Sequence, residues 1–262
     1  MKFLATCTIV FALLMGPRMA QAGDDVHRLV ATAERVARGS ETSASVMTMK
    51  VKKKTYERSY KIVIWDDGRK GKERALVKIL GPALWRGFGT LKLGNQLKIF
   101  NPKSNHITVV GHSMMGDEWM GSHFTNDDLV NVTSLADDFK IKLEKKWSAK
   151  NELGQSATFY RMRLTPTPSA PVAWGKIAYT LWESGDVVMP VKAAYYRKAK
   201  QAKPTRTLAF DGVKKMGKRL VPTRITATVA SKPGEYTRVT YTKLRFDIRI
   251  PNSKFTEQAL RK

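Results

Sequence analysis

Short runs in which hydrophobic and polar residues alternate follow one another along most of the chain. Such alternation is typical of β-strands with one buried and one exposed face. Glycine, proline, asparagine and aspartate separate the runs and favour tight turns. The predicted strands cover residues 43–51, 56–65, 73–80, 88–93, 96–100, 106–110, 139–147, 158–164, 175–182, 187–197, 205–210, 220–230 and 236–250. Short strands joined by tight turns favour an antiparallel meander over β-α-β units.

Turn signals between these strands are clearest at Asp66-Asp67-Gly68, Gly94-Asn95 and Asp211-Gly212. Each combines glycine with aspartate or asparagine, the residues that most readily adopt the left-handed backbone of a tight hairpin. From the whole series we expect about eleven antiparallel strands in one domain, because no long linker or internal repeat divides the chain.

A second pattern, with apolar residues three and four positions apart, predicts helices. Thr125 is a favourable N-cap, and Asp128 at the third helical position favours the helix dipole. The Phe-Thr pair at 255–256 repeats the pair that ends at Thr125, so we expect a short C-terminal helix packed onto the sheet. The predicted helices cover residues 24–37, 125–131 and 256–261.

The balance between strand and helix points to one fold class. A sheet of this size must curl or close to bury its apolar face. Helices this few and short would not cover a flat sheet. We therefore predict a mainly β protein whose large antiparallel sheet is curled into an incomplete, half-open β-barrel, with a few short helices on the concave side. Such a body leaves an apolar cavity between the sheet and the helices.

Residues 106–130 interrupt the strand pattern with a glycine-broken, methionine-rich segment. A strand would not tolerate so many glycines, and a loop in water would not normally carry so much apolar surface. Methionine is flexible and polarisable, which suits a surface that adapts to variable apolar ligands. The predicted ligand-binding residues of the cavity or its lid are Met47, Met49, Trp85, Met114, Met115, Trp119, Met120 and Phe124. The hinge candidates are Gly111, Gly116 and Gly121. The alternative is that these large apolar side chains are simply core.

Residues 1–22 have the features of a cleaved secretory signal. Lys2 precedes an apolar run that is too short to span a bilayer, and a small-x-small cleavage pattern ends at Ala22. The single cysteine, Cys7, lies inside the run and not directly after the cleavage point, which excludes a lipid-anchored cysteine there. We therefore expect an exported, periplasmic chain in which residues 23–262 form one domain without disulfides.

The sequence is strongly basic. It carries a formal charge of +25, and loss of Lys2 and Arg18 with the signal segment leaves +23. In a cytosolic protein this charge would indicate nucleic acid, but an exported chain meets phospholipid headgroups, lipopolysaccharide and acidic polymers instead. Each basic residue near an anionic leaflet contributes about 1 kcal/mol of attraction. We expect an anionic membrane surface as a partner and no nucleic acid. The alternative is that the charge only confers solubility.

Motifs of catalysis and metal binding are absent from the sequence. The four histidines form no His-Glu-x-x-His pattern and no pair one helical turn apart. There is no Gly-x-Ser-x-Gly elbow, and the glycines at 87–89 lack a phosphate-loop ending. Adjacent carboxylates at 66–67, 127–128 and 137–138 fit turn and cap positions. We therefore expect no enzyme activity, no metal and no cofactor.

Two segments and the C-terminus carry a family resemblance. The segments are Gly-Asn-Gln-Leu-Lys-Ile-Phe-Asn-Pro at 94–102 and Gly-Ser-His-Phe-Thr-Asn-Asp-Asp-Leu at 121–129, and Pro251 precedes Phe255-Thr256. Together they resemble the outer-membrane lipoprotein-sorting family, most closely its uncharacterised LolA-like branch, and the region 94–129 is the specific part. The resemblance implies an incomplete antiparallel barrel with a helical lid over a hydrophobic cavity. Better-known members carry lipid chains across the periplasm.

Two functional hypotheses follow. The first is an exported carrier that moves the acyl chains of lipids or lipoproteins between membranes without catalysis, since each buried methylene contributes about 0.8 kcal/mol. The alternative is a periplasmic accessory protein of an inner-membrane exporter, or a binder of anionic polymer through the basic surface. Lipid that co-purifies would favour the first hypothesis, and salt-sensitive binding to polyanions would favour the second.

Overall fold

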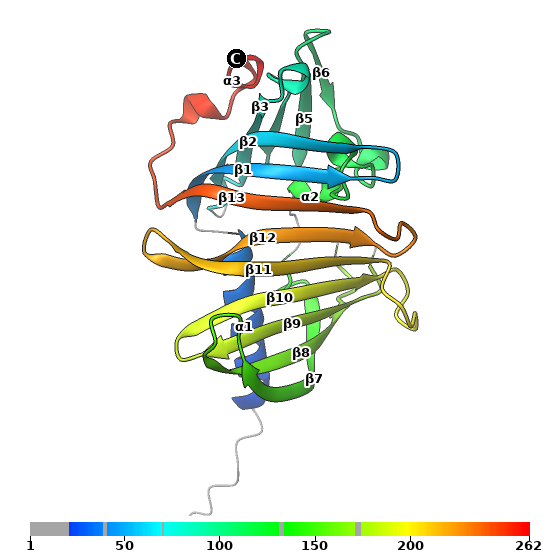
Figure 1. The fold of residues 1–262 in the computed structure, drawn as a ribbon, viewed down its shortest axis with the longest axis vertical. Helices are drawn as coiled ribbons and strands as arrows, with labels where there is room; N and C mark the ends of the chain where they lie inside the picture. The colour runs from blue at the N-terminus through cyan, green and yellow to red at the C-terminus, as the bar shows by residue number, and fades with distance from the viewer. Residues whose placement is uncertain (1–20, 39–40, 70, 131–133, 171–173) are drawn as a thin grey trace, which may run out of the picture.

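The computed structural model describes residues 21–38, 41–69, 71–130, 134–170 and 174–262. Over these residues the chain forms one antiparallel sheet of thirteen strands, with one longer helix and several short ones against it (Figure 1). This confirms the mainly β fold class. Residues 1–20 of the predicted signal segment lie outside the described residues.

Neighbouring strands of the sheet are mostly neighbours in sequence. The order is β6-β5-β4-β3-β2-β1-β13-β12-β11-β10-β9-β8-β7. The bounds are β1 (Thr42–Lys52), β2 (Glu57–Asp67), β3 (Arg74–Gly81), β4 (Gly89–Leu93), β5 (Gln96–Asn101), β6 (His106–Val109), β7 (Phe139–Lys150), β8 (Ser156–Pro166), β9 (Lys176–Ser184), β10 (Val187–Tyr196), β11 (Arg206–Met216), β12 (Arg219–Val229) and β13 (Tyr236–Phe246). β1 and β13 join the two halves, with Met49 opposite Val239. In the described chain β6 and β7 are unpaired edges, so the barrel is open.

The longest helix, α1 (Gln21–Arg38), lies across the lower half of the sheet in Figure 1 and contacts β7, β10 and β12. Its apolar stripe at Leu29, Val30 and Ala33 is fully buried against a cluster that includes Tyr160 and Met162. Burial of each large side chain contributes about 1.5–3 kcal/mol. The helix is therefore fixed by its apolar face and covers one half of the concave side.

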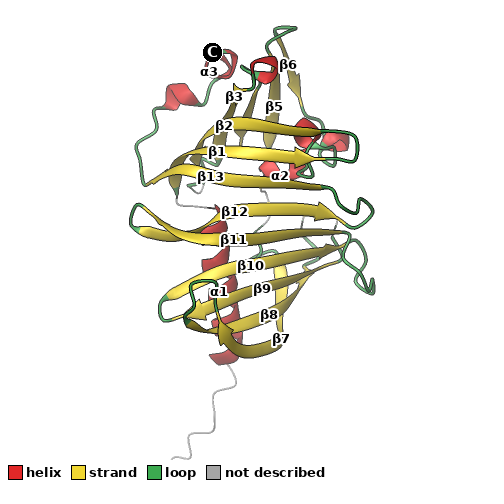
Figure 2. Cartoon of the chain, in the orientation of Figure 1, coloured by secondary structure: helices red, strands yellow, loops and turns green. Residues whose placement is uncertain are grey.

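The short helical segments gather near β2 to β6 (Figure 2). They are η1 (Ala83–Trp85), η2 (His112–Met114), η3 (Trp119–Gly121), α2 (Asn126–Val130), η4 (Asn252–Lys254) and α3 (Glu257–Arg261). Leu129 of α2 packs with the apolar cluster on the concave face, which includes Val77. Leu260 of α3 is fully buried with Leu76, on the opposite face, because successive strand residues point to opposite sides. The prediction placed the helices on the concave side, and α3 departs from it.

The thirteen predicted strand ranges each coincide with a separate strand, so the expected total of about eleven was too low. The predicted turn at Asp211-Gly212 is wrong, because β11 continues through both residues and turns at Gly217. Gly212 has a φ of 68°, and its N–H donates to the carboxylate of Glu152 at 2.8 Å. A side chain from the β7–β8 turn therefore supports this left-handed residue within the strand.

Candidate functional site: a cavity under a lid

A cavity of about 370 Å³ lies between the concave face of the sheet and the segments that cover it. Alternate side chains of β1 to β5 and of β9 to β13 form its floor, because they point to the same face. Its cover consists of α1 on one side and of residues 111–130, called the lid below, on the other. The volume lies in the range of about 300–1,000 Å³ that is typical of small-molecule sites.

Four of the eight predicted ligand-binding residues lie on the wall of this cavity. Met47 and Met49 reach it from β1, and Trp119 and Phe124 reach it from the lid. Met49 is fully buried, and Trp119 is 6% exposed. The structure thus places on one wall residues that are far apart in the sequence, such as Met47 and Trp119, which are more than seventy positions apart. Their role in binding a ligand stays a prediction.

The other four predicted residues do not line the cavity. Trp85 and Met120 pack at the margin of the apolar cluster beneath the lid. Met115 packs against a smaller cluster formed with β5. Met114 lies at the surface with 37% of its area exposed. A 3₁₀-helix of a single turn is too short to form a continuous apolar face. A methionine-rich sequence in such turns therefore does not indicate which side chains point inward.

Trp119 anchors the lid to the floor of the cavity. Its indole Nε1–H donates to Oγ1 of Thr90 on β4, at 3.1 Å, in a buried contact. The hydroxyl of Tyr56 donates to the carbonyl of Gly121 at 3.4 Å, from the turn before β2. The lid is therefore held by directional contacts as well as by apolar burial.

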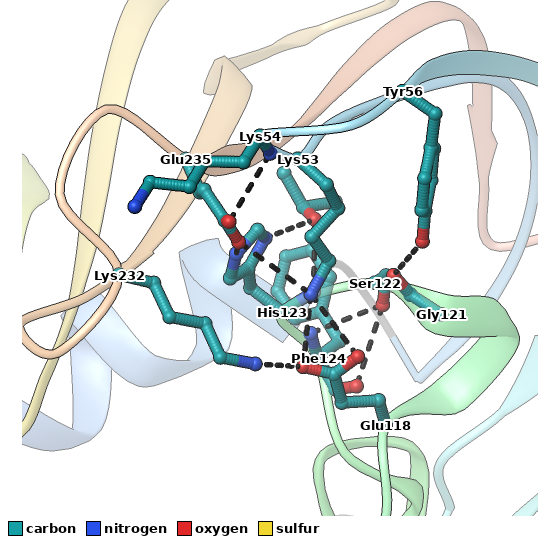
Figure 3. Close-up of polar contacts among 11 residues, drawn as sticks. Lys53, Lys54, Tyr56, Glu118, Gly121, Ser122, His123, Phe124, Lys232 and Glu235 are labelled. Carbon is teal, nitrogen blue, oxygen red and sulfur yellow. Dashed lines mark hydrogen bonds and ion pairs between the residues drawn. The ribbon is translucent and has the colours of Figure 1, made fainter.

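An ion cluster ties the lid to two turns at one end of the sheet (Figure 3). Nζ of Lys53 donates to both oxygens of Glu118, at 2.9 and 3.0 Å, and Nζ of Lys232 donates to Oε1 at 2.7 Å. Burial alone would raise the pKa of Glu118, but these two lysines hold it below its ordinary value. Glu118 stays ionised at neutral pH and connects the lid to the β1–β2 and β12–β13 turns.

His123 is the buried member of the same region, with 3% of its area exposed. Its backbone N–H donates to Oγ1 of Thr237, and its Nδ1 contacts the same oxygen, both at 2.8 Å. Its Nε2 lies 3.4 Å from Oε2 of Glu235 (Figure 3). Burial and the charge of Lys53 lower the pKa of His123. The imidazole is therefore held neutral against Thr237 of β13 and Glu235 of the β12–β13 turn.

The predicted start of α2 is confirmed. The N–H of Thr125 donates to Oδ2 of Asp128 at 2.7 Å, and the N–H of Asp128 donates back to Oγ1 of Thr125 at 3.3 Å. This reciprocal pair is a capping box. The carboxylate of Asp128 also binds Arg206 of β11, a contact that the sequence did not indicate.

The three hinge candidates differ in structure. Gly121 has a φ of 67°, and a Cβ there would lie 3.2 Å from the hydroxyl of Tyr56. Gly111 and Gly116 do not have a left-handed backbone, and a Cβ at either would meet no atom within 4 Å. Glycine is thus required by conformation at 121 alone. Hinge motion at the three positions stays a prediction.

One end of the cavity floor is polar, which sequence reasoning missed. Ser43, Asp66 and Lys92 line the cavity from β1, β2 and β4. Tyr241 lines it from β13, and its burial and the nearby Asp66 carboxylate raise its pKa to about 12. The available signal was the alternation along β2, because Ile62, Ile64 and Asp66 are two positions apart and point to the same face. Asp66 directly precedes Asp67-Gly68, so the sequence pattern favoured a turn residue there.

Among the described residues, no group of three or more His, Cys, Asp or Glu side chains is arranged to hold a metal ion. None of the helices in the described ranges has the length and apolar character needed to cross a membrane. The titratable groups on the cavity wall include Glu34 of α1 and Asp128 of the lid, and both have partners within the protein. Glu34 accepts the N–H of Leu135 at 2.9 Å.

Three crystal structures share this architecture. A DUF1329 family protein from Desulfovibrio piger has 18% identity and a TM-score of 0.75, covering 91% of this chain and 98% of its own. A domain named for outer membrane lipoprotein sorting, from Vibrio parahaemolyticus, has 17% identity and a TM-score of 0.72, with coverage of 93% and 100%. A LolA superfamily protein from Nitrosomonas europaea has 20% identity and a TM-score of 0.67, with coverage of 88% and 97%. At these identities the likeness shows the fold.

Sequence comparison gives the family. Comparison with curated proteins finds no match. Residues 71–262 match the sequence model of a family described as uncharacterised protein, and this range includes the lid and most of the cavity floor. The fold and this match agree with the predicted resemblance to the LolA-like branch of lipoprotein-sorting proteins. The chain therefore belongs to this DUF1329-like family of uncharacterised proteins, built on the LolA-like fold.

Proposed function

We propose that this protein is an exported, periplasmic carrier that holds an acyl chain of a lipid or lipoprotein in its cavity and moves it between membranes without catalysis. The observation that supports this proposal is the apolar cavity of about 370 Å³ under a separate lid. The names of two structural neighbours point in the same direction, since one is named for outer membrane lipoprotein sorting and one for the LolA superfamily.

The energetics of the cavity suit an acyl chain. Met47, Met49 and Ile177 present flexible or branched apolar surface from different strands. Each methylene that leaves water for such a wall contributes about 0.8 kcal/mol, so part of one chain is enough for useful affinity. No reacting group is needed for this function, because binding and release complete the cycle.

Release requires that the cover open. The lid is attached at Trp119, Glu118 and His123 by contacts in which at least one partner is a side chain, while its backbone is not part of the sheet ladder. Such contacts can break without disturbing the strands, since the sheet keeps its own hydrogen bonds. The basic chain, with +23 after removal of residues 1–22, would bring the carrier to anionic headgroups.

Lipid content and chain binding test this proposal. Protein purified from its native envelope is extracted with organic solvent and analysed by mass spectrometry, and a fluorescent fatty acid is titrated into delipidated protein. In the variant Ser45→Phe, a ring projects from β1 into the cavity and lowers affinity at least about tenfold. Thr48→Phe is the control, because Thr48 lies on the exposed face of the same strand.

Co-purified lipid together with selective loss of binding in Ser45→Phe supports the carrier. Urea unfolding of both variants verifies that each is folded. Lipid-free native protein that does not bind the fatty acid would contradict the proposal. Salt-sensitive binding to an acidic polysaccharide in that lipid-free protein would favour the accessory or polymer-binding alternative.

A further inference from the structure

The cavity floor changes from charged to apolar along the direction of the strands. In the register of the sheet, Ser43 lies opposite Asp66, Asp66 opposite Ala75, and Ala75 opposite Lys92. These residues form one row across β1 to β4. Three of them are polar, and all four line the cavity.

The neighbouring rows on the same face are progressively apolar. The next row is formed by Ser45, Ile64, Val77 and Thr90. The row after that is formed by Met47, Ile62 and Ile79. Since same-face residues of one strand are two positions apart, each row lies about 7 Å from the last. The cavity therefore has a polar end and an apolar wall that begins within two rows of it.

The charges in the polar row are separated by a small residue. Asp66 and Lys92 lie two strands apart, about 10 Å between backbones, with the short side chain of Ala75 between them. Both already interact with other groups of the protein, so a ligand would add to existing interactions. Tyr241, which pairs with Met47 in the apolar row, presents a neutral phenol to the same cavity, because burial and the Asp66 carboxylate raise its pKa to about 12.

We infer that this row is a headgroup site, and that the cargo is a single-chain amphiphile whose head combines a phosphate with a primary ammonium. The inference rests on the proposed carrier function and specifies its ligand. The phosphate lies toward Lys92 and the ammonium toward Asp66 and Ser43, while the chain extends over Met47 and Met49. A cavity of about 370 Å³ is small, which favours one chain over two.

The row discriminates between headgroups by charge. A purely anionic head gains attraction from Lys92 but is repelled by Asp66, because both side chains line the same small volume. A zwitterionic head satisfies both. A charge-assisted hydrogen bond from the ammonium to Asp66 corresponds to about tenfold in affinity. The predicted preference is therefore for phosphoethanolamine over phosphoglycerol when the chain is identical.

Two pyrene-labelled lysolipids with the same chain, one with a phosphoethanolamine and one with a phosphoglycerol head, test this inference by fluorescence titration of the full delipidated protein. The wild type is expected to bind the phosphoethanolamine probe about tenfold more tightly. Asp66→Asn should remove that preference by weakening the first probe and strengthening the second. Lys92→Gln should weaken both. The controls are Asp186→Asn and Lys61→Gln, at exposed positions.

The outcomes separate the inference from the function on which it rests. Loss of the headgroup preference in Asp66→Asn, but not in Asp186→Asn, supports the headgroup site. Equal binding of both probes by the wild type overturns the inference and leaves the acyl carrier intact, and so does an unchanged preference in Asp66→Asn. Absence of binding to either probe and to the fluorescent fatty acid overturns the carrier and the headgroup site together. Circular dichroism verifies the fold of each variant.

Discussion

Arg206 and Asp128 form a two-point ion pair between the sheet and the lid. Nη1 of Arg206 donates to Oδ1 of Asp128 at 2.9 Å, and its Nη2 lies 2.7 Å from Oδ2. Arg206 belongs to β11 and Asp128 to α2 in the lid, so the pair connects the two halves of the molecule. The guanidinium also lies 5.9 Å from the ring centre of Phe124. The pair therefore holds the lid, together with Phe124, against the sheet.

Loss of this pair should loosen the lid and lower stability. Arg206 is 5% exposed, so Arg206→Met leaves Asp128 without its buried partner and should reduce the free energy of unfolding by about 3 kcal/mol. Urea unfolding measures the loss, and amide hydrogen exchange of residues 118–130 should become faster. Arg163→Met is the control, because Arg163 pairs with Glu144 on the surface. An equal loss in both variants would mean that the Arg206–Asp128 pair stabilises the fold no more than a surface pair does.

Stability should fall as the pH drops below about 6.5 because of His123. Burial and Lys53 lower its pKa from the ordinary value of 6.5, so the folded protein binds fewer protons than the unfolded chain just below that pH. The free energy of unfolding then decreases as the pH falls from 6.5 toward the lowered pKa. His123→Gln should flatten this part of a urea-unfolding profile. If His106→Gln, at an exposed position, flattens it equally, His123 is not the cause.

A second acid transition should come from the lid ion cluster. Burial would raise the pKa of Glu118, but Lys232 and Lys53 lower it below 4.5, so its stabilising effect is complete above that pH and is lost as the pH falls through the lowered pKa. Glu118→Gln should remove this step and leave the slope near pH 6.5 in place. Urea unfolding of the wild type and of Glu118→Gln at a series of pH values below 4.5 measures it. A wild type that loses no more stability over this interval than the variant would refute this assignment.

Substitution by alanine should change the stability of the protein differently at two lid glycines. Gly121→Ala places a Cβ on a left-handed backbone close to Tyr56 and should cost about 1–2 kcal/mol. Gly116→Ala meets no neighbour and should be neutral, or stabilise by up to about 1 kcal/mol through the unfolded chain. Thermal unfolding distinguishes the two. If Gly116 is also a hinge, its alanine variant should release a bound fluorescent fatty acid more slowly without a loss of stability.

The contribution of the buried Trp119 indole to stability should depend on its hydrogen bond to Thr90. Thr90→Val keeps the shape of the side chain but leaves Nε1–H without its acceptor, at a cost of about 1–3 kcal/mol. Urea unfolding measures the cost, and tryptophan fluorescence reports the changed environment. Thr48→Val, on the exposed face of β1, is the matched control and should change little. A neutral Thr90→Val would show that apolar packing alone holds Trp119.

Local patterns in the sequence determined the elements of this fold. Alternation located all thirteen strands, because it depends only on the period of two between the faces of a strand, although it ended the β11 range at Phe210 where the strand continues to Met216. Thr125 and Asp128 marked the start of α2, since a capping box is complete within four residues. The excess of strand over helix then required a curled sheet with a covered apolar face.

Tertiary structure alone decided how the site is assembled. Arg206 and Asp128 are 78 positions apart, and His123 and Thr237 are 114 apart, so local pattern does not indicate that they meet. Met114 and Trp119 share one methionine-rich segment, yet one is exposed and the other lies on the cavity wall. Strand register brought Ser43, Asp66 and Lys92 into one row. Sequence sets which residues a strand can turn inward, whereas the pairing of distant strands sets which of them share a cavity.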